Sequence, residues 1–148
     1  MNMVYRHLFI IWKIGSVMTI FKYKEQHQSY PGRVHGGLIT AMLDEMGLRA
    51  LWATENSEDT YGVTISLDTQ YRKPVPYCTE LIGKGTILKN TSKFFTTKSC
   101  IMDTSGNVLA NGIIKYIKLD VNKIKEGISV HDEMCYLIKD DVKEINFI

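Results

Sequence analysis

Cysteine is scarce in this sequence of 148 residues, which has only three, and no two of them form a CxxC spacing. Cys78, Cys100 and Cys135 lie far apart along the chain, which argues against a zinc-binding cysteine cluster and against a disulfide framework. We expect reduced, mostly structural thiols in a cytoplasmic protein.

Signatures of metal and serine chemistry are also missing. The histidines are too dispersed to bind a metal together, and neither an HxxxE nor an HExxH spacing occurs. No GxSxG elbow is present, which argues against a serine hydrolase. We therefore expect a protein that uses neither a metal nor a redox cofactor.

Long apolar runs and charge clusters of one sign are missing as well. The most apolar stretch, residues 7–18, is interrupted by Lys13 and is too short to span a bilayer, and no Ala-x-Ala cleavage site follows it. The formal charge is only +2, and basic residues are interleaved with acidic ones. Neither a nucleic acid nor a membrane is therefore expected as a partner.

The rest of the composition is that of a globular domain. With 45% hydrophobic residues, the chain has enough core for one domain. We expect an N-terminal segment of open role at 1–16 that packs on the domain, the domain itself at 17–120, and a C-terminal extension at 121–148. The extension mixes charge with apolar spacing, which is typical of a short helix or a tail.

Periodicity predicts one long helix and several strands within the domain. The helix should run from residue 35 or 36 to residue 53 or 54, and it is apolar almost all the way round, as a buried helix is. A polar connection at 24–32 precedes it. Strands are expected at 17–23, 61–72, 81–88, 93–102 and 108–119. One long helix against an antiparallel sheet is an α+β architecture.

The strand at 61–72 alternates between apolar and polar residues. Val63, Ile65 and Leu67 should share one face, which we expect to be the core face. Strand alternation then predicts that Thr64 points away from the core.

One stretch carries the strongest functional signal, because glycines and an acid interrupt an otherwise apolar helix. His35-Gly36-Gly37 follows a Pro-Gly turn and opens the helix, and Asp44 and Glu45 lie in its middle. Glycines at a helix start let a ligand approach N–H groups that have no intrahelical partner. An acid within a buried helix needs a reason for being there.

At this point the sequence resembles a known family. His35-Gly36-Gly37 with Asp44 and Gly47 is similar to the signature of the PaaI-like group of hotdog-fold acyl-CoA thioesterases. Residues 71–76 (YRKPVP) and 106–110 (GNVLA) resemble the strand end and the last hairpin of that family. The resemblance covers roughly residues 17–119. It implies a long helix wrapped by an antiparallel sheet, and a homodimer or a tetramer that hydrolyses acyl-CoA to a free acid and CoA without a cofactor.

Helix geometry adds a distance argument. Gly37 and Asp44 lie about 11 Å apart on one helix at ~1.5 Å per residue. A thioester carbonyl needs its oxyanion donor and its activated water both within about 3 Å. One subunit therefore cannot supply both groups to one substrate, whereas two antiparallel copies of the helix across a two-fold axis can.

The roles implied by the resemblance centre on Asp44. Asp44 would act as a general base or as a nucleophile, with Glu45 as the less favoured alternative. Thr64 would orient the water or the carboxylate, and Thr60 and Ser66 are rivals for that place.

The helix start would supply the oxyanion donor. The N–H of Gly37, with Gly36 as a second donor, would polarise the thioester carbonyl, helped by the helix dipole. His35 would shape the turn rather than perform acid–base chemistry. The family often has Gly or a carbonyl-binding Asn six residues before this histidine, where this sequence has Ser29, so that Gln28 is a possible substitute donor.

The sequence gives weaker support for substrate-binding residues than for the catalytic ones. Arg72 and Lys73, and less strongly Lys93, are plain surface charges or bind the phosphates of CoA. Residues of the acyl pocket should include Trp52, Phe94 and Phe95. A non-catalytic acyl-CoA-binding hotdog module is the alternative function, and a hydratase of the same fold is a weaker third.

Overall fold

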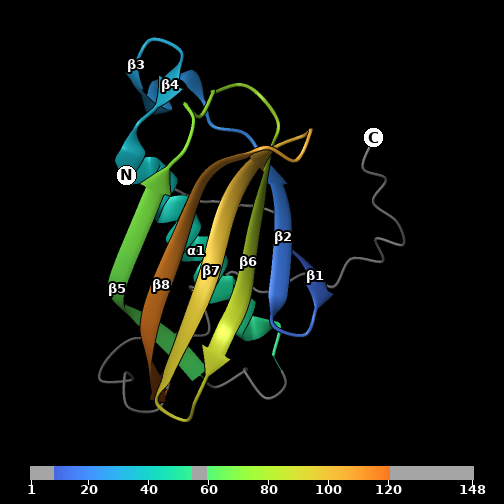
Figure 1. Ribbon diagram of the computed structural model, residues 1–148, viewed down its shortest axis with the longest axis vertical. Helices are drawn as coiled ribbons and strands as arrows, with labels where there is room; N and C mark the ends of the chain where they lie inside the picture. The colour runs from blue at the N-terminus through green and yellow to red at the C-terminus, as the bar shows by residue number, and fades with distance from the viewer. Residues whose placement is uncertain (1–8, 55–59, 121–148) are drawn as a thin grey trace, which may run out of the picture.

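The computed structural model describes residues 9–54 and 60–120 of the chain, so the C-terminal extension predicted at 121–148 lies outside the described residues (Figure 1). The elements, in chain order, are β1 (Phe9–Lys13), β2 (Ser16–Phe21), a 3-10 helix η1 (Glu25–His27), β3 (Gln28–Tyr30), β4 (Arg33–Val34), α1 (Gly36–Trp52), β5 (Thr60–Tyr71), β6 (Leu81–Asn90), β7 (Phe94–Asp103) and β8 (Val108–Asp120).

Six strands form one antiparallel sheet in the order β1-β2-β6-β7-β8-β5, and α1 lies across one of its faces (Figure 1). Short turns join β1 to β2, β6 to β7 and β7 to β8. The β7–β8 turn is held by Asp103, whose carboxylate accepts hydrogen bonds from the backbone of Ser105 and Asn107. The predicted α+β architecture is confirmed.

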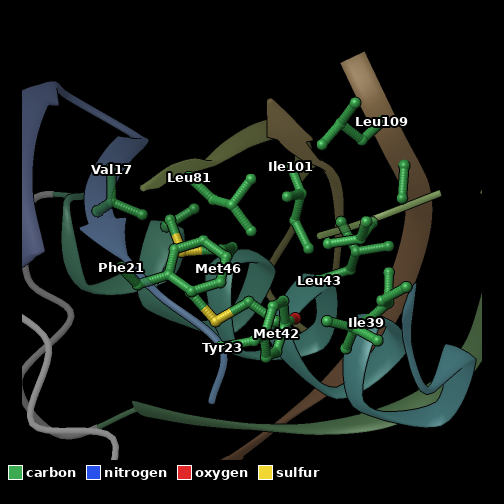
Figure 2. Close-up of a cluster of buried hydrophobic side chains, with 14 of the residues drawn as sticks. Val17, Phe21, Tyr23, Ile39, Met42, Leu43, Met46, Leu81, Ile101 and Leu109 are labelled. Atoms are coloured by element: carbon green, nitrogen blue, oxygen red, sulfur yellow. The ribbon is translucent and has the colours of Figure 1, made fainter. Parts of the chain in front are cut away.

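The core lies between α1 and the sheet. One side of the helix presents Ile39, Met42, Leu43 and Met46, all of them buried. They pack against buried side chains from several strands, among them Val17, Phe21, Leu81, Ile101 and Leu109 (Figure 2). The predicted long helix is therefore confirmed, with bounds that agree to within two residues, and in the described residues it is buried on one side rather than all round.

Glycines allow the middle of α1 to lie unusually close to the sheet. A Cβ atom on Gly85 of β6 would overlap the backbone carbonyl of Met46, and one on Gly47 would overlap the hydroxyls of Thr97 and Tyr116. Backbone therefore meets backbone where these glycines face each other. The position of the helix turn that follows Asp44 is fixed by this contact.

Of the three residues predicted on the core face of β5, Leu67 packs against the core, but the prediction is wrong for Val63 and Ile65, because the strand contains a β-bulge. Thr64 pairs with Tyr116 and Ser66 pairs with Lys115, so Ile65 is an extra residue between two consecutive partners. The predicted core residue Ile65 is 54% exposed. Thr64 instead points at the helix, where its hydroxyl contacts Asp44.

The N-terminal part of the sheet differs from the expected pattern in two respects. β1 pairs with β2, so the sheet begins at Phe9, inside the segment that we set apart at 1–16. The polar connection at 24–32 contains η1 and β3, and β3 forms a small hairpin with β4. The domain bounds at 16 and 120 remain predictions.

Candidate active site

Asp44 is bound by a hydroxyl from the neighbouring strand. It lies on α1, where its side chain is partly exposed, and Thr64 of β5 donates to it from 2.8 Å to Oδ1 and 3.1 Å to Oδ2. Within the described residues neither rival, Thr60 nor Ser66, contacts this carboxylate, and Ser66 faces away from the helix with its partner Lys115. The structure thus brings Asp44 and Thr64 together.

Glu45 has a different environment, although it is the next residue. Its carboxylate forms an ion pair with Arg49 one turn along the helix. The Arg49 guanidinium also contacts two aromatic rings, 4.1 Å from the ring centre of Trp52 and 5.3 Å from that of Phe9. A carboxylate held by a half-buried arginine is a poor general base, which favours Asp44 over Glu45.

The two glycines at the helix start are not equivalent. His35 is the N-cap residue, and its Nδ1 accepts the N–H of Gly37 from 2.9 Å. The N–H of Gly36 has no acceptor within the part of the chain that the structure describes. Of the two, Gly36 is the one whose N–H is available to a ligand.

A tyrosine that sequence reasoning missed supports the same helix start. The Tyr71 hydroxyl donates to the Gly36 carbonyl from 3.0 Å and lies 2.7 Å from Thr40 Oγ1, and Thr40 in turn donates to Thr69. These hydroxyls line the space between α1 and β5 from Gly36 toward Asp44. The only signal in the sequence was the position of Tyr71 in the YRKPVP block.

A second tyrosine that sequence reasoning missed lies beneath Asp44. The Tyr116 hydroxyl donates to the backbone carbonyl of Asp44 from 2.8 Å. Burial raises the pKa of Tyr116 well above its ordinary value, and the negative charge of Asp44 raises it further. The phenol is therefore a hydrogen-bond donor at any physiological pH.

The three cations predicted to bind CoA are not brought together. Backbone N–H groups of Arg72 and Lys73 donate to Leu109 at the start of β8, whereas the Lys93 carbonyl accepts from Lys118 near its end. Nine residues of extended strand separate these two positions, roughly 30 Å at ~3.3 Å per residue. One CoA molecule cannot contact all three cations of a single chain at its phosphates.

A hollow of about 1120 Å³ lies on the face of the sheet opposite α1. Its lining includes Arg72, Lys84 and Lys98. Lys84 and Lys98 alternate along their strands with Gly85 and Thr97, which face the helix, so the hollow is separated from Asp44 by the sheet. The Arg72 guanidinium there already donates to Asn111 and Gln70. This hollow is not the catalytic site of the same chain.

The predicted acyl-pocket residues lie in different surroundings. Phe95 is buried and stacks on Tyr116, with ring centres 4.4 Å apart. Phe94, its neighbour in β7, is 47% exposed on the other face of the sheet. Trp52 lies under Arg49 at the end of the helix. The structure does not gather these three residues into one pocket.

Ser29, which stands where the family often has a carbonyl-binding residue, and its possible substitute Gln28 both lie in the β3–β4 hairpin. Gln28 and Ser29 are both exposed, and Figure 1 shows the hairpin beyond the start of α1. The His35 N–H donates to the His27 carbonyl, which fixes the hairpin next to the helix start.

The described residues contain neither a metal-binding cluster nor a membrane-spanning helix. In residues 9–54 and 60–120, no group of three or more His, Cys, Asp or Glu side chains could hold a metal ion. In the same ranges, no helix is both long enough and apolar enough to cross a membrane.

The chain is similar in sequence to known proteins. Residues 31–110 match the thioesterase superfamily, a range that contains both Asp44 and Thr64. Human acyl-coenzyme A thioesterase 13 is 26% identical over 99 residues, which are 66% of this chain and 69% of that protein.

Solved structures show the same fold. A thioesterase superfamily protein aligns with a TM-score of 0.67 and 24% identity over 74% of this chain, which spans 55% of that protein's length. A Streptococcus mutans protein bound to acetyl-CoA aligns with a TM-score of 0.71 and 14% identity, over 81% of this chain and 94% of that one. The hotdog fold predicted from the sequence is confirmed.

Proposed function

Because the chain belongs to the thioesterase superfamily, we propose that it hydrolyses acyl-CoA thioesters to a free carboxylic acid and CoA, with Asp44 as the catalytic carboxylate. The observation that carries this proposal is the hydrogen bond from Thr64 to Asp44. A similar protein is named acyl-coenzyme A thioesterase 13, and a structure of the same fold holds acetyl-CoA, which supports the choice of substrate. The family prediction is confirmed for the superfamily, while the PaaI-like group remains a prediction.

The chemistry that Asp44 would perform is general-base or nucleophilic catalysis. As a base, its carboxylate takes a proton from water, the water oxygen adds to the thioester carbonyl, and the C–S bond breaks as CoA leaves and takes up a proton. As a nucleophile, the carboxylate adds to the carbonyl itself, and the C–S bond breaks as CoA leaves and takes up a proton from water. A water molecule then hydrolyses the resulting anhydride, which releases the free acid and restores the Asp44 carboxylate. In both cases Thr64 holds the carboxylate in one orientation.

The oxyanion donor in this proposal is the N–H of Gly36 rather than that of Gly37. The Gly37 N–H is already bonded to His35, whereas the N–H of Gly36 has no acceptor among the described residues. The positive end of the helix dipole would add to the stabilisation of negative charge on the carbonyl oxygen.

Two copies of the chain would build each site. Gly36 and Asp44 are separated by eight positions, about 12 Å at ~1.5 Å per residue, so both cannot reach one thioester carbonyl from one helix. β5 is the last strand of the described sheet, and Val63, Ile65 and Tyr71 on it are all exposed. Pairing of this edge with a second β5 would bring Gly36 of one copy to Asp44 of the other. Tetramer formation and the cytoplasmic location remain predictions.

A thiol-release assay tests the proposal. The full chain is incubated with short, medium, long and aryl acyl-CoAs, and free CoA is followed with a thiol reagent. We expect turnover of at least one class, and a loss of about hundredfold or more in Asp44→Asn. Glu45→Gln is the matched control, because it changes the adjacent carboxylate in the same way and should retain activity within about threefold.

A non-catalytic acyl-CoA-binding module is the competing function. It would bind the same compounds in a calorimetric titration and release no CoA, and Asp44→Asn would leave its affinity unchanged. Binding without release across the whole panel would overturn the hydrolase proposal, as would a fully active Asp44→Asn protein.

A further inference from the structure

Asp44 accepts hydrogen bonds from two residues of the sheet that lie opposite each other on adjacent strands. Thr64 of β5 and Tyr116 of β8 are direct cross-strand partners. Thr64 donates to the carboxylate of Asp44, and Tyr116 donates to its backbone carbonyl. The two ends of one residue are thus held by two neighbours on adjacent strands.

The Tyr116 side chain has little freedom to move. It is completely buried, and its ring stacks on Phe95 with an interplanar angle of 9°. A buried ring fixed by stacking holds its hydroxyl at one point. The hydroxyl can therefore restrain the position of the helix, because its own position is fixed by the sheet.

Gly47 gives this hydroxyl access to the helix backbone. A Cβ at residue 47 would overlap the Tyr116 and Thr97 hydroxyls, and it would lie 3.2 Å from Ser99 Oγ. Three hydroxyls therefore converge on the helix turn after Asp44. Of the three, the Tyr116 hydroxyl is the one that bonds to the helix backbone, whereas Ser99 Oγ is buried without a hydrogen-bond partner among the described residues.

A carbonyl within a helix has two lone pairs, so it can accept a side-chain hydroxyl in addition to its helical N–H. The Asp44 carbonyl does not need the Tyr116 hydroxyl to be satisfied, so satisfying that carbonyl is not the reason for a buried hydroxyl at this place. The hydrogen bond between them does fix the rotation and height of the helix turn relative to the sheet. Catalytic groups must be held within about 0.5 Å of the productive geometry, so this restraint has functional value.

From these contacts we propose that Tyr116 is a positioning residue for the reaction: its hydroxyl holds the turn of α1 that carries Asp44, so that the carboxylate stays in register with Thr64 and with the thioester. The proposal rests on the proposed catalytic role of Asp44. Tyr116 touches neither the substrate nor the reacting atoms in this role.

Tyr116→Phe tests the proposal, because it removes one oxygen and keeps the stacked ring. We expect kcat to fall about tenfold with KM unchanged within about twofold, since the loss concerns the placement of a reacting group and not substrate binding. Ser99→Ala is the matched control. It removes a buried hydroxyl from the same cluster that has no hydrogen-bond partner within the described residues, and should leave kcat unchanged.

A second measurement separates positioning from a general structural role. In an Asp44→Asn background, Tyr116→Phe should cause no further loss of the residual activity, because the carboxylate that it positions is gone. A structural defect would lower activity by the same factor in both backgrounds. That result overturns the proposal, as does a folded Tyr116→Phe protein with the kcat of the parent, or one that fails to fold while Ser99→Ala folds normally.

The same set of proteins distinguishes this proposal from the proposed function. If Asp44→Asn remains active, the catalytic assignment fails and the role of Tyr116 fails with it. If Asp44→Asn is inactive and Tyr116→Phe matches the parent protein, only the role of Tyr116 fails.

Discussion

The Thr64 hydroxyl lies 2.8 Å and 3.1 Å from the two carboxylate oxygens of Asp44, and it reaches them from the strand at the edge of the sheet. The residue after Thr64 is the extra residue of a β-bulge. Bulges occur next to active sites because they re-aim a side chain while the rest of the strand keeps its pairing. The direction in which the Thr64 hydroxyl points therefore depends on both the bulge in β5 and the position of α1.

Removing this hydroxyl should reduce turnover strongly. A hydrogen bond to a charged group is worth about 1.5–3 kcal/mol, which corresponds to roughly tenfold to hundredfold in rate. We expect a loss of kcat in that range for Thr64→Val, and near-parent activity for Thr64→Ser, measured by steady-state CoA release. Ser66→Ala, on the opposite face, is the control and should have no effect. Equal activity of Thr64→Val and the parent protein would exclude a catalytic contribution of this bond.

The assignment of the oxyanion donor can be tested by deleting a single N–H. Proline is tolerated at the first helical position, and the extended conformation of His35 (φ −60°, ψ 131°) is the one that a residue before proline prefers. We expect Gly36→Pro to lower kcat about 10²–10³-fold because the donor is lost. Gly36→Ala is the matched control, since it adds the same Cβ, which lies 3.3 Å from Tyr71 Oη, and keeps the N–H. If alanine and proline have the same effect, the N–H of Gly36 is not the donor.

The close contact between α1 and β6 predicts different costs for two glycines of the same strand. A Cβ on Gly85 would overlap the Met46 backbone, which cannot move without displacing the helix. We expect Gly85→Ala to lower the free energy of unfolding by about 2–3 kcal/mol. A Cβ on Gly83 would meet the flexible Met46 side chain, 3.0 Å from its sulfur, and Gly83→Ala should cost about 1 kcal/mol or less. Urea denaturation measures both, and the reverse order would contradict the packing described here.

Thiol reactivity should separate the two cysteines that the structure describes. Cys78 is exposed, whereas burial raises the pKa of the Cys100 thiol above its usual value despite the nearby Lys84 and Lys98. A raised pKa means less thiolate at a given pH, so Cys100 should be alkylated more slowly than Cys78 at neutral pH. Its rate should keep rising at a pH where an ordinary thiol has already reached its maximum.

Iodoacetamide labelling followed by peptide mass mapping resolves the individual cysteines, including Cys135, which lies outside the described residues. Cys78→Ser is the control that confirms the assignment of the fast reaction. Equal labelling rates for Cys78 and Cys100 at neutral pH would show that Cys100 is not protected.

Much of the fold could be predicted from the sequence because the signals are local. A turn, two glycines and a long apolar run indicate the helix. The sequence from Asp103 to Asn107 indicates the β7–β8 turn. Local signals fail where pairing between distant segments decides the outcome. The bulge at Ile65 reverses the faces expected from alternation, and only the register with β8 reveals it.

The residues of the candidate site also fall into those with a local sequence signal and those without one. Asp44 and the glycines stand out within one stretch of sequence, so they could be named in advance. Which glycine has a free N–H depends on the orientation of the His35 ring, which no spacing rule gives. Tyr116 contacts Asp44 across 72 positions, and nothing near it in the sequence points to that contact.

The restraints on α1 have a consequence for its length. The helix is fixed at its start by His35 and Tyr71, and again at Gly47, where it meets Gly85 and Tyr116. One inserted or deleted residue between Gly36 and Gly47 would rotate Asp44 by about 100° relative to one of these fixed points. The number of residues in this segment is therefore constrained, whereas a length change beyond Trp52 would leave both fixed points in place.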